Sequence, residues 1–166
     1  MSYIIRSAGK DDEPFLWEML YYAAHMDEED VNSLQAAKKD ADLAKYVKDW
    51  GDETDRGCIA LDQSGTRPIG AAWIRLLIGN EKTISYVDDV TPELAIAVLP
   101  EYLGKGVGTQ LLTHILDAAR EHFSSVVLSV RATNPARRLY ERMGFVVFGT
   151  ARNRVGTESL NMRRYL

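Results

Sequence analysis

The sequence predicts an α+β domain in which helices flank a central mixed β-sheet, and three observations lead to this. Short apolar segments rich in β-branched residues alternate with segments whose apolar residues recur at helical spacing. A helix follows each of the strands expected at 93–99 and 126–130, which favours some parallel pairing. The length of 166 residues, with 46% hydrophobic and 27% charged residues, fits one globular domain over residues 1–166.

The first third of the chain predicts one strand and two helices. Residues 3–6 are short and β-branched, as in a strand. Asp11 or Asp12 can cap a helix that has Pro14 in its first turn and runs to about His25. After the acidic segment 27–30, we expect a second helix over 33–50, capped by Ser33.

The middle of the chain predicts a hairpin, a loop and a third sheet strand. Strands over 57–61 and 68–78 flank a turn at 62–66, and this pair reads as a β-hairpin. Residues 79–92 are polar and are expected to form a loop. The following strand alternates over 93–99 and ends at Pro100.

The last third predicts two further helices and three strands. A helix with a clear apolar face follows the glycines at 104–108, and a strand follows at 126–130. Asn134 can cap a short helix that ends at Met143, with Gly144 as its stop. The final strands are expected at 145–148 and 160–165, which gives the order βααβββαβαββ.

Composition excludes several classes of protein. The apolar stretches are far too short to cross a membrane, so no membrane partner is expected. No secretory signal is visible, and the single Cys58 cannot form an internal disulfide, which together predict a cytoplasmic protein. No Cys/His set supports a metal site, and a net charge of −4 argues against nucleic acid as a partner.

The net charge is divided unevenly along the chain. Residues 1–55 hold 6 basic and 14 acidic residues, a net charge of −8, whereas residues 56–166 hold 14 and 10, a net charge of +4. Solvation of the surface charges is one explanation of this division. The alternative is that the two parts of the chain face partners of opposite charge.

Three alternating glycines lie between the strand 93–99 and the helix that follows it. Glycine tolerates positive φ and carries no side chain, so successive N–H groups at Gly104, Gly106 and Gly108 can turn towards one anion. The helix N-terminus adds further N–H donors, so the pattern predicts diphosphate binding. The alternative is a plain strand-to-helix turn. A P-loop is excluded because Gly106 follows Lys105 where Ser or Thr is required, and a dinucleotide fingerprint lacks its third glycine.

With these residues, the chain resembles the GNAT superfamily of acetyl-CoA-dependent N-acetyltransferases. Their phosphate motif, Arg/Gln-x-x-Gly-x-Gly/Ala, follows a strand that ends in Val-x-Pro, and here Val98-Leu99-Pro100 precedes the segment 103–108. Leu103 departs from the family's Arg or Gln. The resemblance runs from Ile5 through the segment 134–145, Asn-Pro-Ala-Arg-Arg-Leu-Tyr-Glu-Arg-Met-Gly-Phe.

The resemblance implies a GNAT-like three-layer fold, acetyl-CoA as cosubstrate without a metal, and direct attack by a primary amine in a ternary complex. It implies that the strand 93–99 pairs with the pantetheine arm, that the glycine loop holds the pyrophosphate, and that Asn134 contacts the cofactor. Tyr140 would protonate the departing thiolate. Homodimers are common among relatives, so a homodimer is among the expected partners. The cofactor-binding residues so implied are Ile96, Ala97, Val98, Leu103, Gly104, Lys105, Gly106, Val107, Gly108, Thr109 and Asn134.

The general base has to be sought among the acidic residues. Glu93 opens the strand expected to border the thioester, where a carboxylate could take a proton through water; the alternative is a solvated strand end. Asp88 and Asp89 are secondary candidates, and the three histidines do not cluster in the sequence. Cys58 lies in an apolar strand and predicts a buried thiol rather than a covalent acyl-enzyme.

The acceptor pocket implied by the resemblance lies between the first two helices, the loop before strand 93–99 and the final strands. It would include Trp17, Tyr21, Tyr22, Trp50, Trp73 and Arg75, although core packing is the alternative for the aromatic residues. Two other function classes stay open: a non-catalytic acyl-CoA-binding regulatory module on the same fold, and a nucleotide-binding oxidoreductase.

Overall fold

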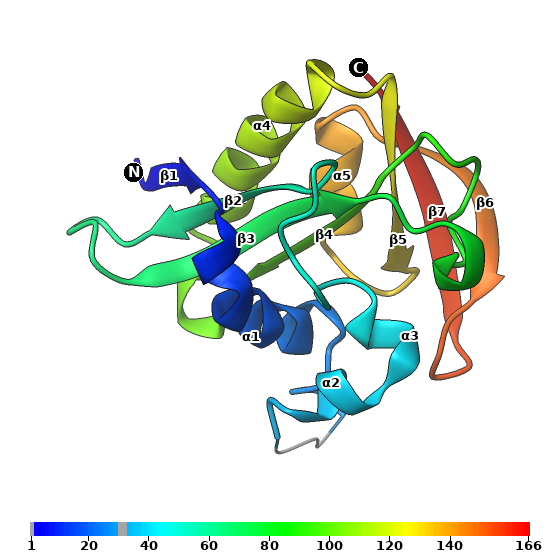
Figure 1. Cartoon of the computed structure of the whole chain (residues 1–166), viewed down its shortest axis with the longest axis horizontal. Coiled ribbons are helices and arrows are strands. Elements are labelled where there is room, and N and C mark those ends of the chain that lie inside the picture. Colours follow the sequence, from blue (N-terminus) through cyan, green and yellow to red (C-terminus); the bar gives the residue numbers. More distant parts are fainter. Residues whose placement is uncertain (1, 30–32) are drawn as a thin grey trace.

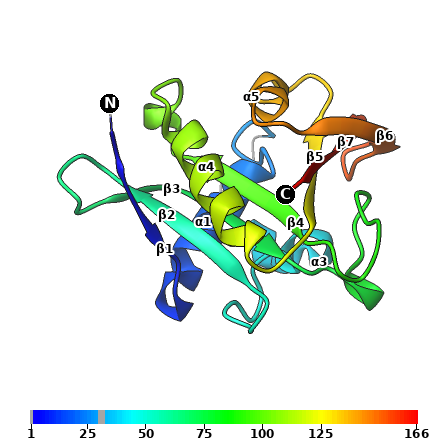
Figure 2. The ribbon, with the colours of Figure 1, turned by 90° about the horizontal axis from the view of Figure 1, so that it is seen from above.

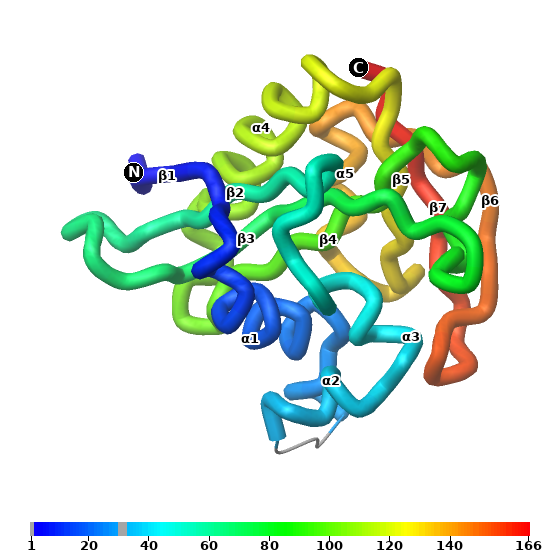
Figure 3. The backbone as a smooth tube through the Cα atoms, viewed as in Figure 1, coloured from blue at the N-terminus to red at the C-terminus, as the bar shows by residue number. Residues whose placement is uncertain are grey.

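Seven strands form one mixed sheet in the computed structural model, which describes residues 2–29 and 33–166. The strand order across the sheet is β1-β2-β3-β4-β5-β7-β6, and β4 and β5 are its parallel pair (Figure 1). Figure 3 shows β1 at one edge of the sheet and β6 at the other. The strands are β1 (Ile4–Ser7), β2 (Arg56–Leu61), β3 (Pro68–Arg75), β4 (Glu93–Val98), β5 (Ser125–Arg131), β6 (Val146–Arg152) and β7 (Glu158–Tyr165).

The helices lie between these strands, largely where the sequence predicts them. The α-helices are α1 (Glu13–Ala23), α2 (Ala36–Lys39), α3 (Ala41–Ala44), α4 (Val107–Arg120) and α5 (Arg137–Arg142). Three short 3₁₀ helices are η1 (Lys10–Asp12), η2 (Gly79–Glu81) and η3 (Pro100–Tyr102). None of the helices within the described ranges combines the length and the apolar character that a membrane span requires.

Side-chain alternation along β3 separates the two faces of the sheet. A Cβ atom on Gly70 would lie 3.1 Å from Leu111 of α4, so Gly70 faces α4. Trp73, an odd number of residues further on, points to the other face and donates its indole N–H to the carbonyl of Tyr46, which follows α3. Helix α4 therefore covers one face and α1 to α3 cover the other (Figures 1 and 2), which confirms the three-layer arrangement.

The core fills the space between the sheet and both helical layers. Trp73, Leu16, Ile59 and Leu111 are among the largest side chains that are fully buried. Burying each such side chain stabilises the fold by about 1.5–3 kcal/mol, so the apolar pattern of the strands and of α4 decides the layering.

The helix predicted over 33–50 is wrong as a single element. The structure has two short helices, α2 and α3, separated at Asp40, whose backbone is extended with φ −100° and ψ 111°. The Asp40 carboxylate accepts the N–H of Asp42 and so caps α3. Aspartate favours such a cap over a helix interior because its side chain competes for nearby backbone donors. Of the acidic segment 27–30, Asp30 lies outside the described residues.

Candidate active site

The parallel strands β4 and β5 pair at a single register position and then separate. Glu93 of β4 lies opposite Val127 of β5, and the N–H of Val127 donates to the carbonyl of Pro92 at 3.1 Å. Figure 1 shows the two strands diverging beyond this point. The rest of β4 therefore has one edge without a neighbouring strand.

The hydrogen bonds at both ends of β4 show which backbone groups face the separation. The N–H of Leu99 donates to Ile69 of β3 at 2.8 Å, whereas the carbonyl of Pro92 faces β5. Because backbone groups of successive strand residues point to opposite sides, Ile96 and Val98 face the separation. Ala97 has its backbone directed towards β3, where it lies opposite Ala71. Of the three β4 residues predicted to contact the cofactor, two thus direct their backbone groups towards the separation, where no strand of the described residues pairs with them.

The glycine loop connects the end of β4 to α4. Gly104 and Gly106 have φ of 73° and 84°, and a Cβ atom added at either would meet open space. Gly106 is the N-cap of α4, and its carbonyl accepts the first intrahelical bond, from Gln110. By helix geometry the N–H groups of 107–109 then lack intrahelical partners. The loop therefore presents a run of backbone donors to one side of the molecule.

The side chains of the predicted loop residues have different environments. Leu103 is 63% exposed, and Lys105 is exposed with its ammonium 5.4 Å from the ring centroid of Tyr102. The Val107 side chain is buried in the core, so this residue can contribute only its backbone. Thr109 is exposed, and its carbonyl accepts the hydroxyl of Thr113.

Helix α5 lies against the start of α4. A Cβ atom on Gly108 would approach Leu139 of α5 to 3.2 Å, so the third glycine of the loop permits this close contact. The contact brings the glycine loop and the segment 134–145 together, although they are separated in the sequence.

Asn134 lies at the start of the turn that leads into α5. Its Oδ1 accepts the N–H of Ala136 at 2.9 Å within this turn, but the N-cap of α5 is Ala136, so the prediction that Asn134 caps the helix is wrong. A depression of about 390 Å³ surrounds it, lined by Ala132, Thr133, Asn134, Pro135, Arg137 and Arg138. Arg137 pairs with Glu141 at 2.7 Å, whereas Arg138 is exposed and makes no ion pair with the described residues.

Tyr140 is the buried residue of α5. Its ring packs edge-on against Phe145 with centroids 6.0 Å apart, and burial raises the pKa of Tyr140 to about 12. Its hydroxyl forms no hydrogen bond with any residue in the described ranges. The phenol is therefore protonated at neutral pH and available to donate.

Glu93 is enclosed rather than solvated. It is 6% exposed, and its carboxylate accepts hydrogen bonds from the hydroxyls of Tyr46, Thr83 and Ser85. Burial raises the pKa of Glu93, and the three hydroxyl donors offset part of that rise. The same burial, together with the nearby carboxylate, raises the pKa of Tyr46 well above its ordinary value. Glu93 is thus a buried carboxylate at the point where β4 and β5 separate.

Most of the residues expected to line the acceptor pocket belong to the core. Trp73 is fully buried, and Trp50 donates its indole N–H to Gly9. The Arg75 guanidinium forms a 3.1 Å ion pair with Asp55 and donates to the carbonyls of residues 45, 48 and 49. Core packing, the alternative considered for the aromatic residues, applies to Trp17, Tyr21, Trp50 and Trp73, whereas Tyr22 is half-buried.

The structure adds a group of residues that sequence reasoning missed. The turn after α1 contacts β5 and the β6–β7 hairpin through Glu29, which accepts from Arg131 at 2.7 Å and from Arg154 at 2.8 Å. In the same turn, His25 lies with Nε2 3.2 Å from the side-chain nitrogen of Asn134. These contacts join residues more than 100 positions apart, so no local sequence pattern could have revealed them.

Cys58 has a simple structural role. Cys58 is buried, its thiol lies 3.6 Å from the carbonyl of Leu111, and burial raises the pKa of Cys58 to about 12, which suits a buried thiol rather than a nucleophile. Within the described ranges there is no group of His, Cys, Asp and Glu that could hold a metal ion.

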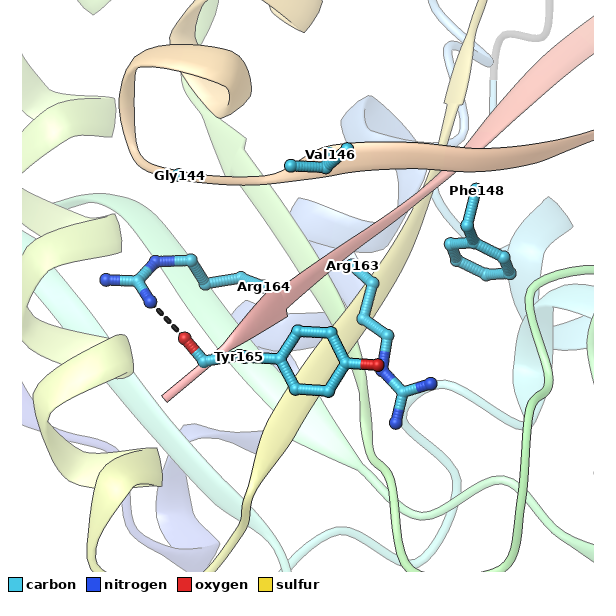
Figure 4. A pocket seen from close by; sticks show the side chains of 6 residues that line it. All are labelled: Gly144, Val146, Phe148, Arg163, Arg164 and Tyr165. Carbon is cyan, nitrogen blue, oxygen red and sulfur yellow. Dashed lines mark hydrogen bonds between the residues drawn. The ribbon is translucent and has the colours of Figure 1, made fainter.

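A second, larger hollow of about 460 Å³ lies on β6 and β7 (Figure 4). Its lining residues are Gly144, Val146, Phe148, Arg163, Arg164 and Tyr165. Arg163 donates to Ser125 and lies 4.6 Å from the Tyr165 ring centroid, while Arg164 donates to the carbonyls of Met143 and Tyr165. This lining has no carboxylate or histidine for acid–base chemistry, so the separation between β4 and β5 is the better candidate site.

Comparisons with known proteins address the family to which the chain belongs. The Acetyltransferase (GNAT) family description matches residues 17–145. Among solved structures, a GCN5-related N-acetyltransferase from Kribbella flavida matches with a TM-score of 0.69 and 21% identity, covering 99% of this chain and 98% of that one. A chimera of the spermidine N-acetyltransferase SpeG from Vibrio cholerae and hSSAT matches with a TM-score of 0.67 and 21% identity, covering 99% and 96%.

A third similar structure is a ribosomal-protein-alanine N-acetyltransferase from Brucella melitensis. It has a TM-score of 0.68 and 20% identity, covering 98% of this chain and 99% of that one. At these identities the structural matches establish the fold. A comparison with curated protein sequences finds no match. Because the family description covers most of the chain, including the glycine loop and α5, the chain belongs to the GNAT acetyltransferase family.

Proposed function

We propose that this chain transfers an acetyl group from acetyl-CoA to a primary amine, by direct attack of the amine in a ternary complex. The observation that carries the proposal is the separation of β4 from β5 beyond Glu93 and Val127. It leaves the backbone of Ile96 and Val98 without a strand partner, on an edge that leads directly into the glycine loop.

The glycine loop fits the diphosphate of the cosubstrate. Gly104 and Gly106 have positive φ and open space where a Cβ would lie, so the loop can approach an anion closely. Free N–H groups at the start of α4 and the helix dipole favour negative charge there. The exposed cations of Lys105 and Arg138 lie on the two sequence segments that form this region. The chemistry of this donor set therefore suits a polyanionic cosubstrate.

The free edge of β4 would hold and activate the thioester. Acetyl-CoA, when bound, supplies an activated acyl group and a thiolate leaving group. The backbone groups of Ile96 and Val98 would bind the pantetheine amides as a neighbouring strand does. The N–H of Val98 would donate to the oxygen on which negative charge develops, and a fixed backbone donor needs no reorganisation as this happens.

Tyr140 and Glu93 would move the two protons of the reaction. The Tyr140 phenol donates to the departing sulfur, a role that its protonated state and free hydroxyl allow. Glu93 accepts the proton of the attacking amine through one of the hydroxyls that surround it. Its raised pKa makes Glu93 a stronger base than an exposed glutamate.

The deciding experiment measures amine-dependent thiol release by the full chain. Acetyl-CoA is incubated with single amines from a panel of amino acids, peptides and polyamines, and free thiol is detected. Release that rises with one class of amine supports the proposal. If calorimetry shows acetyl-CoA binding while no amine raises thiol release above its amine-free rate, the chain is the non-catalytic acyl-CoA-binding module instead.

A further inference from the structure

The turn after α1 is held firmly over the end of β5. Glu29 bridges Arg131 and Arg154, and both guanidinium groups also donate to the carbonyl of Ala24, at 3.3 and 2.9 Å. Burial opposes ionisation of Glu29, but hydrogen bonds from the two arginines outweigh it and lower the pKa of Glu29. These bonds fix the backbone on both sides of His25.

His25 itself has an unusual backbone conformation. Its φ is +60°, a region that residues other than glycine seldom adopt, and its side chain is only 25% exposed. Its ring lies between two partners: Nδ1 contacts the carboxylate of Glu28, and Nε2 lies 3.2 Å from Nδ2 of Asn134. The surrounding bonds therefore direct this ring towards the start of α5.

The hydrogen bonds around Asn134 determine which ring nitrogen carries a proton. The N–H of Ala136 needs an acceptor, and the Oδ1 of Asn134 provides it at 2.9 Å. The other end of the amide, which faces His25, is then the NH₂ group, which can only donate. Nε2 of His25 must accept this bond and carry no proton, so the proton lies on Nδ1 and is donated to Glu28.

Protonation of His25 is incompatible with this arrangement. An imidazolium has an N–H at Nε2 that would face the NH₂ group of Asn134, donor against donor. Rotation of the amide by 180° would relieve that conflict, but it would place NH₂ against the N–H of Ala136. Acidification therefore has to break either the His25–Asn134 contact or the hydrogen bond between Asn134 and Ala136 in the turn before α5.

We infer that His25 is a positioning residue whose neutral ring holds Asn134, and that protonation of His25 releases Asn134 and lowers the affinity for acetyl-CoA. The effect on acetyl-CoA rests on the proposed function and on the contact between Asn134 and the cofactor that the resemblance implies. The charged groups around the ring have opposite effects on protonation of the His25 imidazole. Glu28 and Glu29 favour the imidazolium, whereas Arg131 and Arg154 disfavour it.

The ring tautomer is tested directly, without any ligand. Long-range ¹H–¹⁵N correlation spectra of the full chain report which imidazole nitrogen is protonated. At pH 8 we expect Nδ1–H for His25, and the side-chain NH₂ signal of Asn134 should shift as His25 titrates on acidification. An Nε2–H tautomer at pH 8, or an Asn134 signal that does not respond to His25, would overturn the inference.

The consequence for binding is tested by calorimetry with acetyl-CoA between pH 8 and 5.5, in wild type, His25→Gln and His114→Gln. A glutamine can accept from Asn134 at every pH, and His114 is an exposed residue of α4 that serves as the matched control. Relative to His25→Gln, wild type and His114→Gln should lose about fivefold in affinity on acidification, the effect of one ordinary hydrogen bond. Dividing each affinity by the affinity of His25→Gln at the same pH cancels the effect that ionisation of the acetyl-CoA phosphate has on binding.

The possible outcomes separate this inference from the proposed function. Equal pH dependence in wild type and His25→Gln, with both proteins folded by circular dichroism, contradicts a positioning role of His25. A wild-type chain that binds no acetyl-CoA at pH 8 contradicts the proposed function. In that case the tautomer and the Asn134 response still decide whether His25 holds Asn134.

Discussion

Glu93 and Val127 lie opposite one another at the single register position at which β4 and β5 pair. A parallel pair that continued along both strands would satisfy the backbone of Ile96 and Val98 within the sheet. Because pairing stops at Glu93, these groups stay free, and the strand edge leads into the glycine loop. The separation of two neighbouring strands therefore forms the candidate site, with the buried carboxylate of Glu93 at the point where the strands still pair.

The first prediction concerns the positive-φ glycines. Gly106→Glu should abolish acetyl-CoA binding in calorimetry, because its side chain would bring bulk and negative charge to the phosphate-binding loop. Gly156→Glu is a matched control, since Gly156 has the same φ of 84° and the same open space, but lies between β6 and β7. Both variants should lose similar stability, and only the first should lose binding. Wild-type affinity in Gly106→Glu would rule out this loop as the phosphate site.

The second prediction concerns the contact between α4 and α5. Gly108→Val would crowd Leu139, whose Cδ2 atom lies 3.2 Å from the position of a Cβ, and overpacking of this kind costs about 1–3 kcal/mol. We expect a lower Tm and weaker acetyl-CoA binding. Adding Leu139→Ala should restore part of the affinity, because it makes room for the valine. A double variant as weak as the sum of the single variants would argue against a direct contact.

Local features of the site could be predicted from the sequence. The glycine loop and the strand before it depend on neighbouring residues, and both occur in the structure at the expected positions. Glycine at positive φ acts within a few residues, which is why a single sequence shows it. The order of strands and helices follows from the same local signals.

Long-range packing could not be predicted in this way. The resemblance implies that Arg75 and Trp73 line the acceptor pocket, yet the structure uses both within the core. Glu93 starts a strand like a solvated residue, but the hydroxyls of Ser85 and of Tyr46, which is 47 positions away, enclose it. The helix predicted over 33–50 divides because one aspartate caps instead of continuing the helix. The outcomes for Arg75, Trp73 and Glu93 depend on partners far along the chain that no local pattern identifies, whereas the Asp40 cap is a local signal that outweighs the helical spacing of the apolar residues.

The third prediction concerns the buried ion pair of Arg75 and Asp55. The two side chains are 9% and 4% exposed, and removing one partner of such a pair leaves a buried charge uncompensated. Asp55→Asn should therefore lower the free energy of unfolding by about 3–5 kcal/mol in urea denaturation. The exposed pair of Arg67 and Glu101 gives the control, and Glu101→Gln should change stability by less than about 1 kcal/mol. A small effect of Asp55→Asn would reopen a role for Arg75 in binding the acceptor.

The fourth prediction concerns Tyr140. Tyr140→Phe keeps the ring that packs against Phe145 but removes the hydroxyl, so acetyl-CoA affinity should be unchanged while kcat falls about 10²–10⁴-fold. Tyr165→Phe, at a 65% exposed position on β7, should leave kcat unchanged. Because the pKa of Tyr140 is about 12, wild-type activity should show no loss from tyrosine ionisation below pH 10. An unchanged kcat in Tyr140→Phe would exclude this tyrosine as the acid.

The last prediction uses the raised pKa of Glu93, which results from burial and is only partly offset by hydroxyl donors. If Glu93 is the base, kcat/KM of wild type should fall on acidification with an apparent pKa above that of an exposed glutamate. Glu93→Gln should lower kcat/KM and remove this acidic limb, whereas Glu121→Gln, at an exposed position, should keep it.

Stability provides an independent measure of the same group. The folded chain holds the Glu93 proton more tightly than the unfolded chain does. The stability that this proton confers is therefore fully present below the unfolded pKa and is lost as pH rises through the folded pKa. Glu93→Gln keeps a neutral side chain at every pH. The Tm of Glu93→Gln minus the Tm of wild type should therefore increase as the pH rises from 4 to 8. A Tm difference that is independent of pH would mean that Glu93 titrates like an exposed carboxylate, and its enclosure by Tyr46, Thr83 and Ser85 would then not tune it for proton transfer.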